Sequence, residues 1–144
     1  MTTYKVQWGG WDDDGEALVG SLDELDALLD RLSVASDVDG YPYKIGIFVV
    51  GLRHGPFPVG VEITVADPRR ASLLYSGPGG MGWGFDDAIP LEPGDPILVN
   101  SGGEPTEYDA ERWRVTPDQA RQAVREFVTT GHRPTCLTWD CAPD

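Results

Sequence analysis

The sequence has few basic residues. Its 144 residues include 24 Asp and Glu against 11 Lys and Arg, so the formal net charge is −13 with neutral histidines. Nucleic-acid binding needs Lys and Arg to neutralise phosphates and release counterions, and anionic membrane surfaces attract the same residues. We therefore expect no nucleic acid and no membrane among its partners.

Cysteine and histidine are scarce, with two of each. On an extended strand Cys136 and Cys141 would lie about 17 Å apart on opposite faces, which favours reduced thiols. A sharp bend after Trp139 would still permit a disulfide. His54 and His132 each stand beside glycine, which favours solvated turn residues over a catalytic base. The sequence also lacks zinc-ligand spacings, a P-loop and nucleophile motifs, so we expect no enzyme activity, metal or cofactor.

Long hydrophobic runs are absent as well. None approaches the roughly 20 residues of a membrane-spanning helix. The N-terminal sequence has no basic start followed by an apolar stretch, which is not typical of a secretory signal and favours a cytoplasmic protein. With no linker and a length typical of one domain, we expect a single domain over residues 1–144.

Hydrophobic periodicity predicts an α+β domain, a mainly antiparallel sheet with two amphipathic helices packed on it. The first helix follows the capping-box pattern of Ser21 and Glu24, and its leucines continue at helical spacing to Leu32. The second begins at Thr116-Pro117 and ends before Gly131. Strands are expected at 4–8, 16–19, 44–52, 59–66, 71–76, 97–100 and 134–140.

Turns or loops are expected at 53–58, 77–96 and 101–109. The glycine-rich part of the long loop, 77–84, has no Lys, which argues against a phosphate cradle. Its aromatic residues Trp83 and Phe85 either pack back onto the sheet or stand exposed. The acidic run 12–14 does not fit a calcium loop, so it is either a solvated hairpin tip or a partner contact.

The C-terminal third carries a distinctive pattern, an amphipathic helix followed by R-P-T and an alternating strand that closes on Trp. The residues of this pattern are Ala123, Glu126, Phe127, Thr130, Gly131, Arg133, Pro134, Thr135 and Trp139. Upstream, the leucine-rich helix and L-L-Y-S-G followed by G-W add further matches. In these features the sequence resembles the first-numbered immunity-protein family of bacterial polymorphic toxin systems, often encoded beside deaminase toxins.

This resemblance implies a protein that binds and neutralises a cognate secreted toxin by stoichiometric inhibition. A deaminase or another toxin acting on nucleic acid would present a basic active-site cleft, to which an acidic inhibitor is attracted. Two alternatives remain open. One is a small regulatory or ligand-binding module that uses the Gly/aromatic loop as a lid, and the other is an enzyme that uses clustered carboxylates.

We expect the toxin-facing surface to be acidic, aromatic and built from loops. The residues predicted for it are Trp11, Asp12, Asp13, Asp14, Trp83, Asp86, Asp87, Glu104, Glu107 and Asp109. Acidic residues are concentrated early in the chain, since residues 1–39 hold ten of them against Lys5 and Arg31. By contrast, Leu28, Val124 and Phe127 are expected in the core, and Gly131, Arg133 and Trp139 in structural roles.

Overall fold

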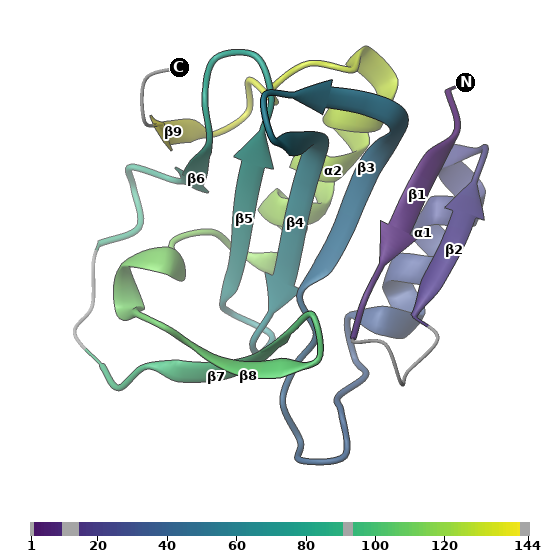
Figure 1. Cartoon of the computed structure of the whole chain (residues 1–144). Helices are drawn as coiled ribbons and strands as arrows, with labels where there is room; N and C mark the ends of the chain where they lie inside the picture. The colour runs from purple at the N-terminus through teal and green to yellow at the C-terminus, as the bar shows by residue number, and fades with distance from the viewer. Residues whose placement is uncertain (1, 10–14, 91–93, 142–144) are drawn as a thin grey trace.

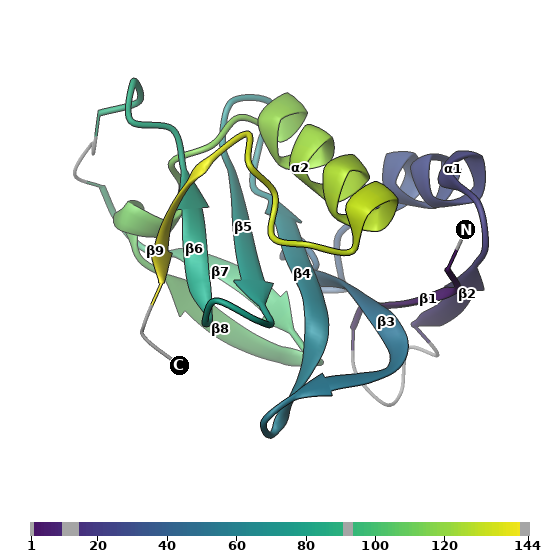
Figure 2. The ribbon, with the colours of Figure 1, turned by 90° about the horizontal axis from the view of Figure 1, so that it is seen from above.

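The computed structural model describes residues 2–9, 15–90 and 94–141. Within them, two helices lie on one face of a seven-stranded sheet whose six ladders are all antiparallel (Figures 1 and 2). In spatial order the strands are β2 (Glu16–Val19), β1 (Tyr4–Gln7), β3 (Ile45–His54), β4 (Phe57–Val65), β5 (Ala71–Ser76), β6 (Gly82–Phe85) and β9 (Thr138–Cys141). The helices are α1 (Leu22–Leu32) and α2 (Pro117–Thr130). The predicted α+β fold is confirmed.

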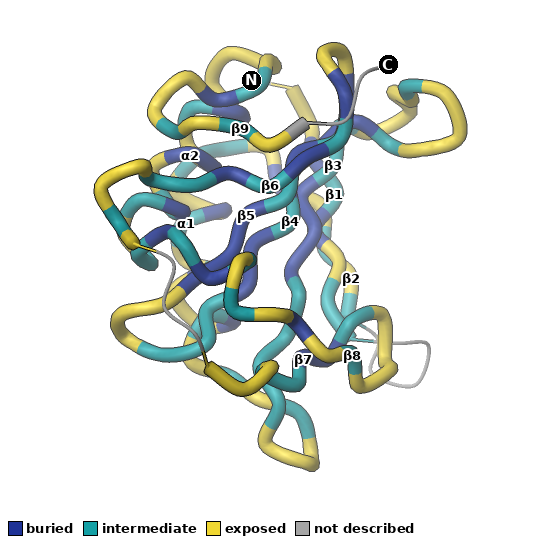
Figure 3. The backbone as a smooth tube through the Cα atoms, turned by 90° about the vertical axis from the view of Figure 1, so that its left-hand side faces the viewer, coloured by how far each residue is buried: buried dark blue, intermediate teal, exposed yellow. Residues whose placement is uncertain are grey.

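Alternation along the central strands places one apolar face of the sheet against the helices. The strand residues of this core include Tyr4, Val6, Ile45, Ile47, Val59, Val61, Ile63, Leu73 and Tyr75. Figure 3 shows the buried backbone concentrated in these central strands. The predicted core residues Val124 and Phe127 are fully buried, and Leu28 is partly buried and packs against the same core cluster.

Both helices begin where the sequence predicts. Thr116 and Gln119 form a complete capping box at the start of α2, and Gly131 ends that helix with a left-handed φ of 75°. At α1, Ser21 Oγ accepts a hydrogen bond from the Glu24 N–H, but the Glu24 carboxylate accepts from Gly20. The reciprocal half of the predicted Ser21 capping box is therefore not formed.

Three predicted loops are shorter than expected. Residues 53–58 are mostly strand, because β3 continues to His54 and β4 begins at Phe57. The 77–96 segment contains β6, which is paired on both sides by β5 and β9. The 101–109 segment contains β8 (Glu104–Tyr108), which pairs with β7 (Ile97–Ser101). Conversely, the last predicted strand, 134–140, is regular only from Thr138.

The β7–β8 hairpin is separate from the main sheet and is anchored by the buried Asn100. The backbone N–H of Asn100 donates to the Pro42 carbonyl at 2.8 Å, and its carbonyl accepts from the Lys44 N–H at 2.9 Å. Its side chain donates to Asp37 and accepts from the Gly103 N–H, both at 2.9 Å. The first three of these bonds connect the hairpin to the segment before β3, and the fourth lies within the turn of the hairpin.

The residues of the C-terminal pattern hold α2 to β9. The Glu126 carboxylate accepts hydrogen bonds from the backbone and hydroxyl of Thr135. The Trp139 indole N–H donates to the Pro134 carbonyl at 2.7 Å, and its ring meets Tyr75 edge-on. These contacts are internal, as expected for structural roles. Cys136 lies in the connecting segment as a free, exposed thiol.

Candidate partner-binding face

The face of the sheet opposite the helices, here called the open face, has a floor formed by Phe48. A Cβ atom added at Gly46 or Gly60 would overlap the Phe48 ring, so the two glycines let that ring lie flat across β3 and β4. Glycine inside a strand weakens it and often marks a close approach of a side chain or another backbone. The flat ring leaves a shallow space above the centre of the sheet.

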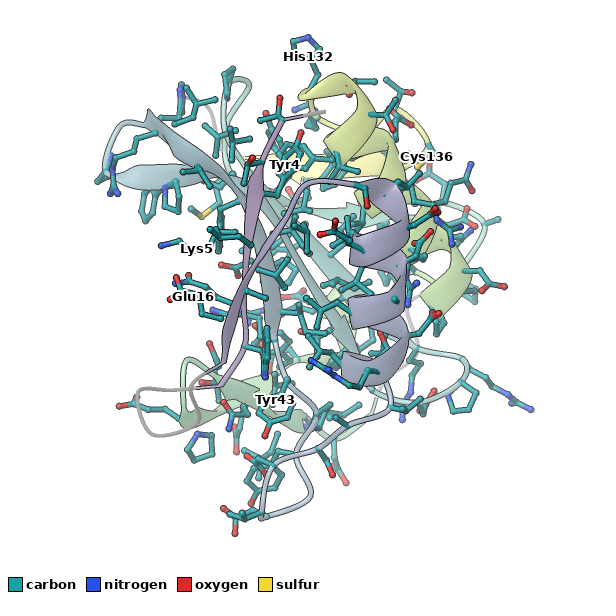
Figure 4. The ribbon with its side chains drawn as sticks, turned by 90° about the vertical axis from the view of Figure 1, so that its right-hand side faces the viewer. Tyr4, Lys5, Glu16, Tyr43, His132 and Cys136 are labelled. Carbon is teal, nitrogen blue, oxygen red and sulfur yellow. The ribbon has the colours of Figure 1, made fainter. Side chains whose placement is uncertain are left out.

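A cleft of about 590 Å³ lies on this floor. Its lining includes Gln7, Trp8, Glu16, Lys44, Phe48, Glu62 and, at the turn of the β7–β8 hairpin, Gly102. Lys44 lies 3.5 Å from the Glu62 carboxylate, and Lys5 lies 3.2 Å from that of Glu16. Figure 4 shows Lys5 and Glu16 on the side of the sheet away from α1.

The connection between β3 and β4 extends beyond the sheet on the open side, away from the two helices (Figure 2). We call residues 49–58 the β3–β4 arm. A register shift between Phe48 and Arg53 bends the arm away from the sheet. Gly51 and Gly55 have φ values of 78° and 61°, which only glycine adopts without strain. The Arg53 guanidinium donates to the Pro56 carbonyl across the turn.

The β7–β8 hairpin, which also lies on the open face, covers a small aromatic cluster. Tyr108 packs between Trp83 and Trp113, with ring centroids 5.5 and 5.7 Å away. The Arg112 guanidinium lies 4.7 Å from the Trp83 ring centroid and 4.9 Å from that of Tyr108. Burial, together with the nearby Glu62 carboxylate, raises the pKa of Tyr108 to about 12. The β7–β8 hairpin is therefore fixed against the sheet.

The predicted partner residues fall into three groups. Trp11, Asp12, Asp13 and Asp14 lie outside the described residues. Glu104, Glu107 and Asp109 are exposed along β8 and directly after it, and among the described residues none of their carboxylates has a cation within 4 Å. The prediction that these glutamates lie in a loop was wrong, because the 101–109 segment pairs with β7.

The third group has internal contacts. Trp83 lies on β6, not in a loop, and its ring is half-buried beneath Arg112. Asp86 accepts hydrogen bonds from the Ala88 N–H at 2.9 Å and the Gln119 side chain at 2.6 Å, and these bonds lower its pKa. Asp87 is exposed and accepts from the Thr138 hydroxyl at 3.2 Å. Their role at a partner surface stays a prediction.

Sequence reasoning missed Phe48, the β3–β4 arm and Asn100. The strand glycines 46 and 60 were a usable signal for Phe48, because glycine in a central strand points to a close contact above it. No sequence pattern near the β3–β4 arm or near Asn100 predicted their roles. The exposure of the arm and the anchoring of Asn100 both depend on segments that are distant in the sequence.

Features of a catalytic or membrane site are few in the described part of the chain. No group of three or more His, Cys, Asp or Glu there could hold a metal ion. His54 ends β3, and His132 is exposed just after α2. No described helix is both long enough and apolar enough to cross a membrane. The features that stand out in the described residues are the cleft over Phe48, the exposed β3–β4 arm and the exposed carboxylates on and after β8.

A comparison with models of known protein families identifies the family of this chain. Residues 13–140 match the model of the family described as "Immunity protein Imm1", and the chain belongs to that family. No curated protein matches the sequence. Family membership makes this chain an immunity protein and implies a cognate toxin as its partner.

Proposed function

We propose that this immunity protein neutralises its toxin by stoichiometric binding in the cytoplasm, without catalysis of its own. The toxin we propose acts on nucleic acid, with a deaminase as the first candidate. Such an enzyme holds a polyanionic substrate in a basic cleft, and the same field attracts an acidic inhibitor. The net charge of −13 supports this pairing.

The observation that carries the proposal is a group of three exposed carboxylates on β8 and directly after it, Glu104, Glu107 and Asp109, which lack a nearby cation among the described residues. Fixed charges on a rigid hairpin steer association and lose no stabilising ion pair when they meet a basic partner. The consecutive aspartates 12–14 and Trp11 are proposed for the same interface on sequence grounds, and Asp87 on its exposure.

The alternative of a ligand-binding module with an aromatic lid gains no support. Trp83 is packed beneath Arg112, and the Arg114 guanidinium lies 4.7 Å from the Phe85 ring centroid. Both aromatic residues belong to β6 and are held by intramolecular contacts. A lid needs at least one of these rings to be free to move.

The proposal is tested with the catalytic domain of the cognate toxin, for which the genes beside this protein's gene are searched first. We expect a 1:1 complex by light scattering, and toxin activity on nucleic acid that falls to background at one equivalent of the immunity protein. The immunity protein alone should leave nucleic acid unmodified. A wild-type protein that neither binds this domain nor protects cells from it would refute the proposal.

The electrostatic part is tested by association kinetics at several salt concentrations. Asp12/Asp13/Asp14→Asn and Glu104/Glu107→Gln should each slow association several-fold and flatten its salt dependence. Asp23→Asn with Asp118→Asn is the control, because it removes exposed carboxylates at the starts of the two helices, on the other face. An equal effect of the control would mean that only net charge matters.

A further inference from the structure

We propose that the open face binds a protruding segment of the toxin in one defined orientation, with its apolar end on the β3–β4 arm and its basic end at the turn of the β7–β8 hairpin. This inference rests on the proposed function and specifies which surface performs it. It follows from three features of the open face, which are its exposed apolar end, its uneven charge and its recessed floor.

The apolar end is the β3–β4 arm. Val50, Leu52 and Phe57 are 52%, 49% and 50% exposed, and they make up half of the large exposed hydrophobic residues in the described ranges. Contiguous exposed apolar patches are typical of interaction surfaces, and these three residues lie within eight positions of one another on the arm. Pro56 and Pro58 restrict the arm's backbone, and the register shift and the Arg53 hydrogen bond fix its bend. A preorganised arm loses little conformational entropy when it is covered.

The charge of the open face changes along its length. No Asp or Glu occurs between Gly40 and Val61, whereas Arg53 lies on the arm. Toward the β7–β8 hairpin the face carries Glu16 and Glu62, which are paired with Lys5 and Lys44, and also Glu104, which follows the hairpin turn and has no cation within 4 Å among the described residues. A basic segment of the partner is therefore attracted to the hairpin end of the face and repelled by Arg53 at the arm. Complementary charge sets the register of a partner in this way.

The floor between the two ends is recessed and long enough for a loop or hairpin. From Lys44 at the cleft to Leu52 on the arm, the chain has a contour length of about 26 Å at the usual rise per residue, and the register shift after Phe48 makes the direct distance shorter. Phe48 lies flat between them, over glycines that add no side-chain bulk. The cleft of about 590 Å³ accepts side chains that point down from a partner's backbone. This shape fits an inserted segment better than a flat surface.

The test measures binding of the same toxin domain by surface plasmon resonance to two double variants. Leu52→Ser/Phe57→Ser should raise the dissociation rate by about tenfold or more and leave the salt dependence of association unchanged. Glu16→Gln/Glu104→Gln should slow association and flatten its salt dependence, with a smaller effect on dissociation. Val34→Ser is the matched control, since Val34 is 87% exposed and lies beside α2 on the helix side.

Orientation is tested with a photo-crosslinking amino acid at position 57 or position 104. We expect two different toxin peptides, an apolar one captured from position 57 and a Lys/Arg-rich one from position 104. Folded arm variants, shown by circular dichroism, that dissociate at the wild-type rate would overturn the inference and leave the proposed function standing. Arm variants that change the sedimentation of the protein alone would assign the face to self-association and overturn it too. A wild-type protein that does not bind the toxin domain refutes both proposals.

Discussion

The guanidinium of Arg112 lies over the ring of Trp83, 4.7 Å from its centroid, and Trp83 belongs to β6, which is paired between β5 and β9 in the main sheet. The same guanidinium contacts Tyr108, which is buried in the same cluster. One cation thus packs against an aromatic residue of β6 and another of β8. This contact, together with the hydrogen bonds of Asn100, holds the β7–β8 hairpin against the sheet.

Replacing Arg112 should therefore loosen the hairpin. Arg112→Ala should lower the free energy of unfolding by roughly 1 kcal/mol, a typical value for a partly desolvated cation–π contact. Urea denaturation followed by tryptophan fluorescence measures it. Arg69→Ala is the control, because Arg69 is exposed in the turn between β4 and β5. Equal stability of the two variants would show that the contact contributes nothing.

The packing of Phe48 on Gly46 predicts a strong coupling between the two positions. Gly46→Ala should cost about 1–3 kcal/mol, because the new methyl group overlaps the ring. In a Phe48→Ala background the same change should cost much less, and a double-mutant cycle measures the difference. Gly20→Ala should be close to neutral, since a Cβ there meets nothing within 4 Å. Additive effects at 46 and 48 would contradict the flat-ring arrangement.

Phe127 should be among the most costly core residues to truncate. It is fully buried on α2, and its ring meets those of Tyr4 and Tyr75 edge-on at 5.9 and 6.4 Å. Phe127→Ala should cost about 3–5 kcal/mol, seen as a lower urea midpoint. The same substitution at the half-exposed Phe57 should leave stability nearly unchanged. An unchanged midpoint for Phe127→Ala would refute its placement in the core.

Acid should destabilise the protein through Asp37. Burial raises the pKa of this carboxyl, but hydrogen bonds from Tyr41, Asn100, Asp39 and Gly40 outweigh burial and hold the pKa below its usual value of 3.8. A pKa that is lower in the folded state gives stability that is present above the unfolded value and lost as pH falls through the folded one. The loss should therefore begin below about pH 4.

Thermal denaturation between pH 7 and pH 3 checks this prediction. Asp37→Asn should be less stable than wild type at pH 7 and should lose less stability on acidification. Asp39→Asn is the control, because its exposed side chain belongs to the same turn. If Asp37→Asn and wild type lose the same stability between pH 5 and pH 3, the hydrogen bonds to this carboxylate do not contribute.

The sequence by itself determined the two helices and most of the first five strands. The caps at Ser21 and Thr116, the stop at Gly131, the alternation in β1 and the short apolar runs of β3 to β5 are signals within a few residues. They therefore need no tertiary contact to be detected. The family could also be identified from the sequence, because its C-terminal pattern is one continuous stretch of residues. In the structure, residues of this stretch are hydrogen-bonded to one another.

Tertiary structure alone decided β6, β8 and the open face. The segment around Trp83 is glycine-rich and becomes a strand because β5 and β9 pair with both its edges. The hairpin is placed by the hydrogen bond between Asp37 and Asn100, which are 63 residues apart. The cleft likewise joins residues of β1, β3 and β4 with the turn at Gly102. Long-range pairing and packing set these positions, and local propensity carries no information about them.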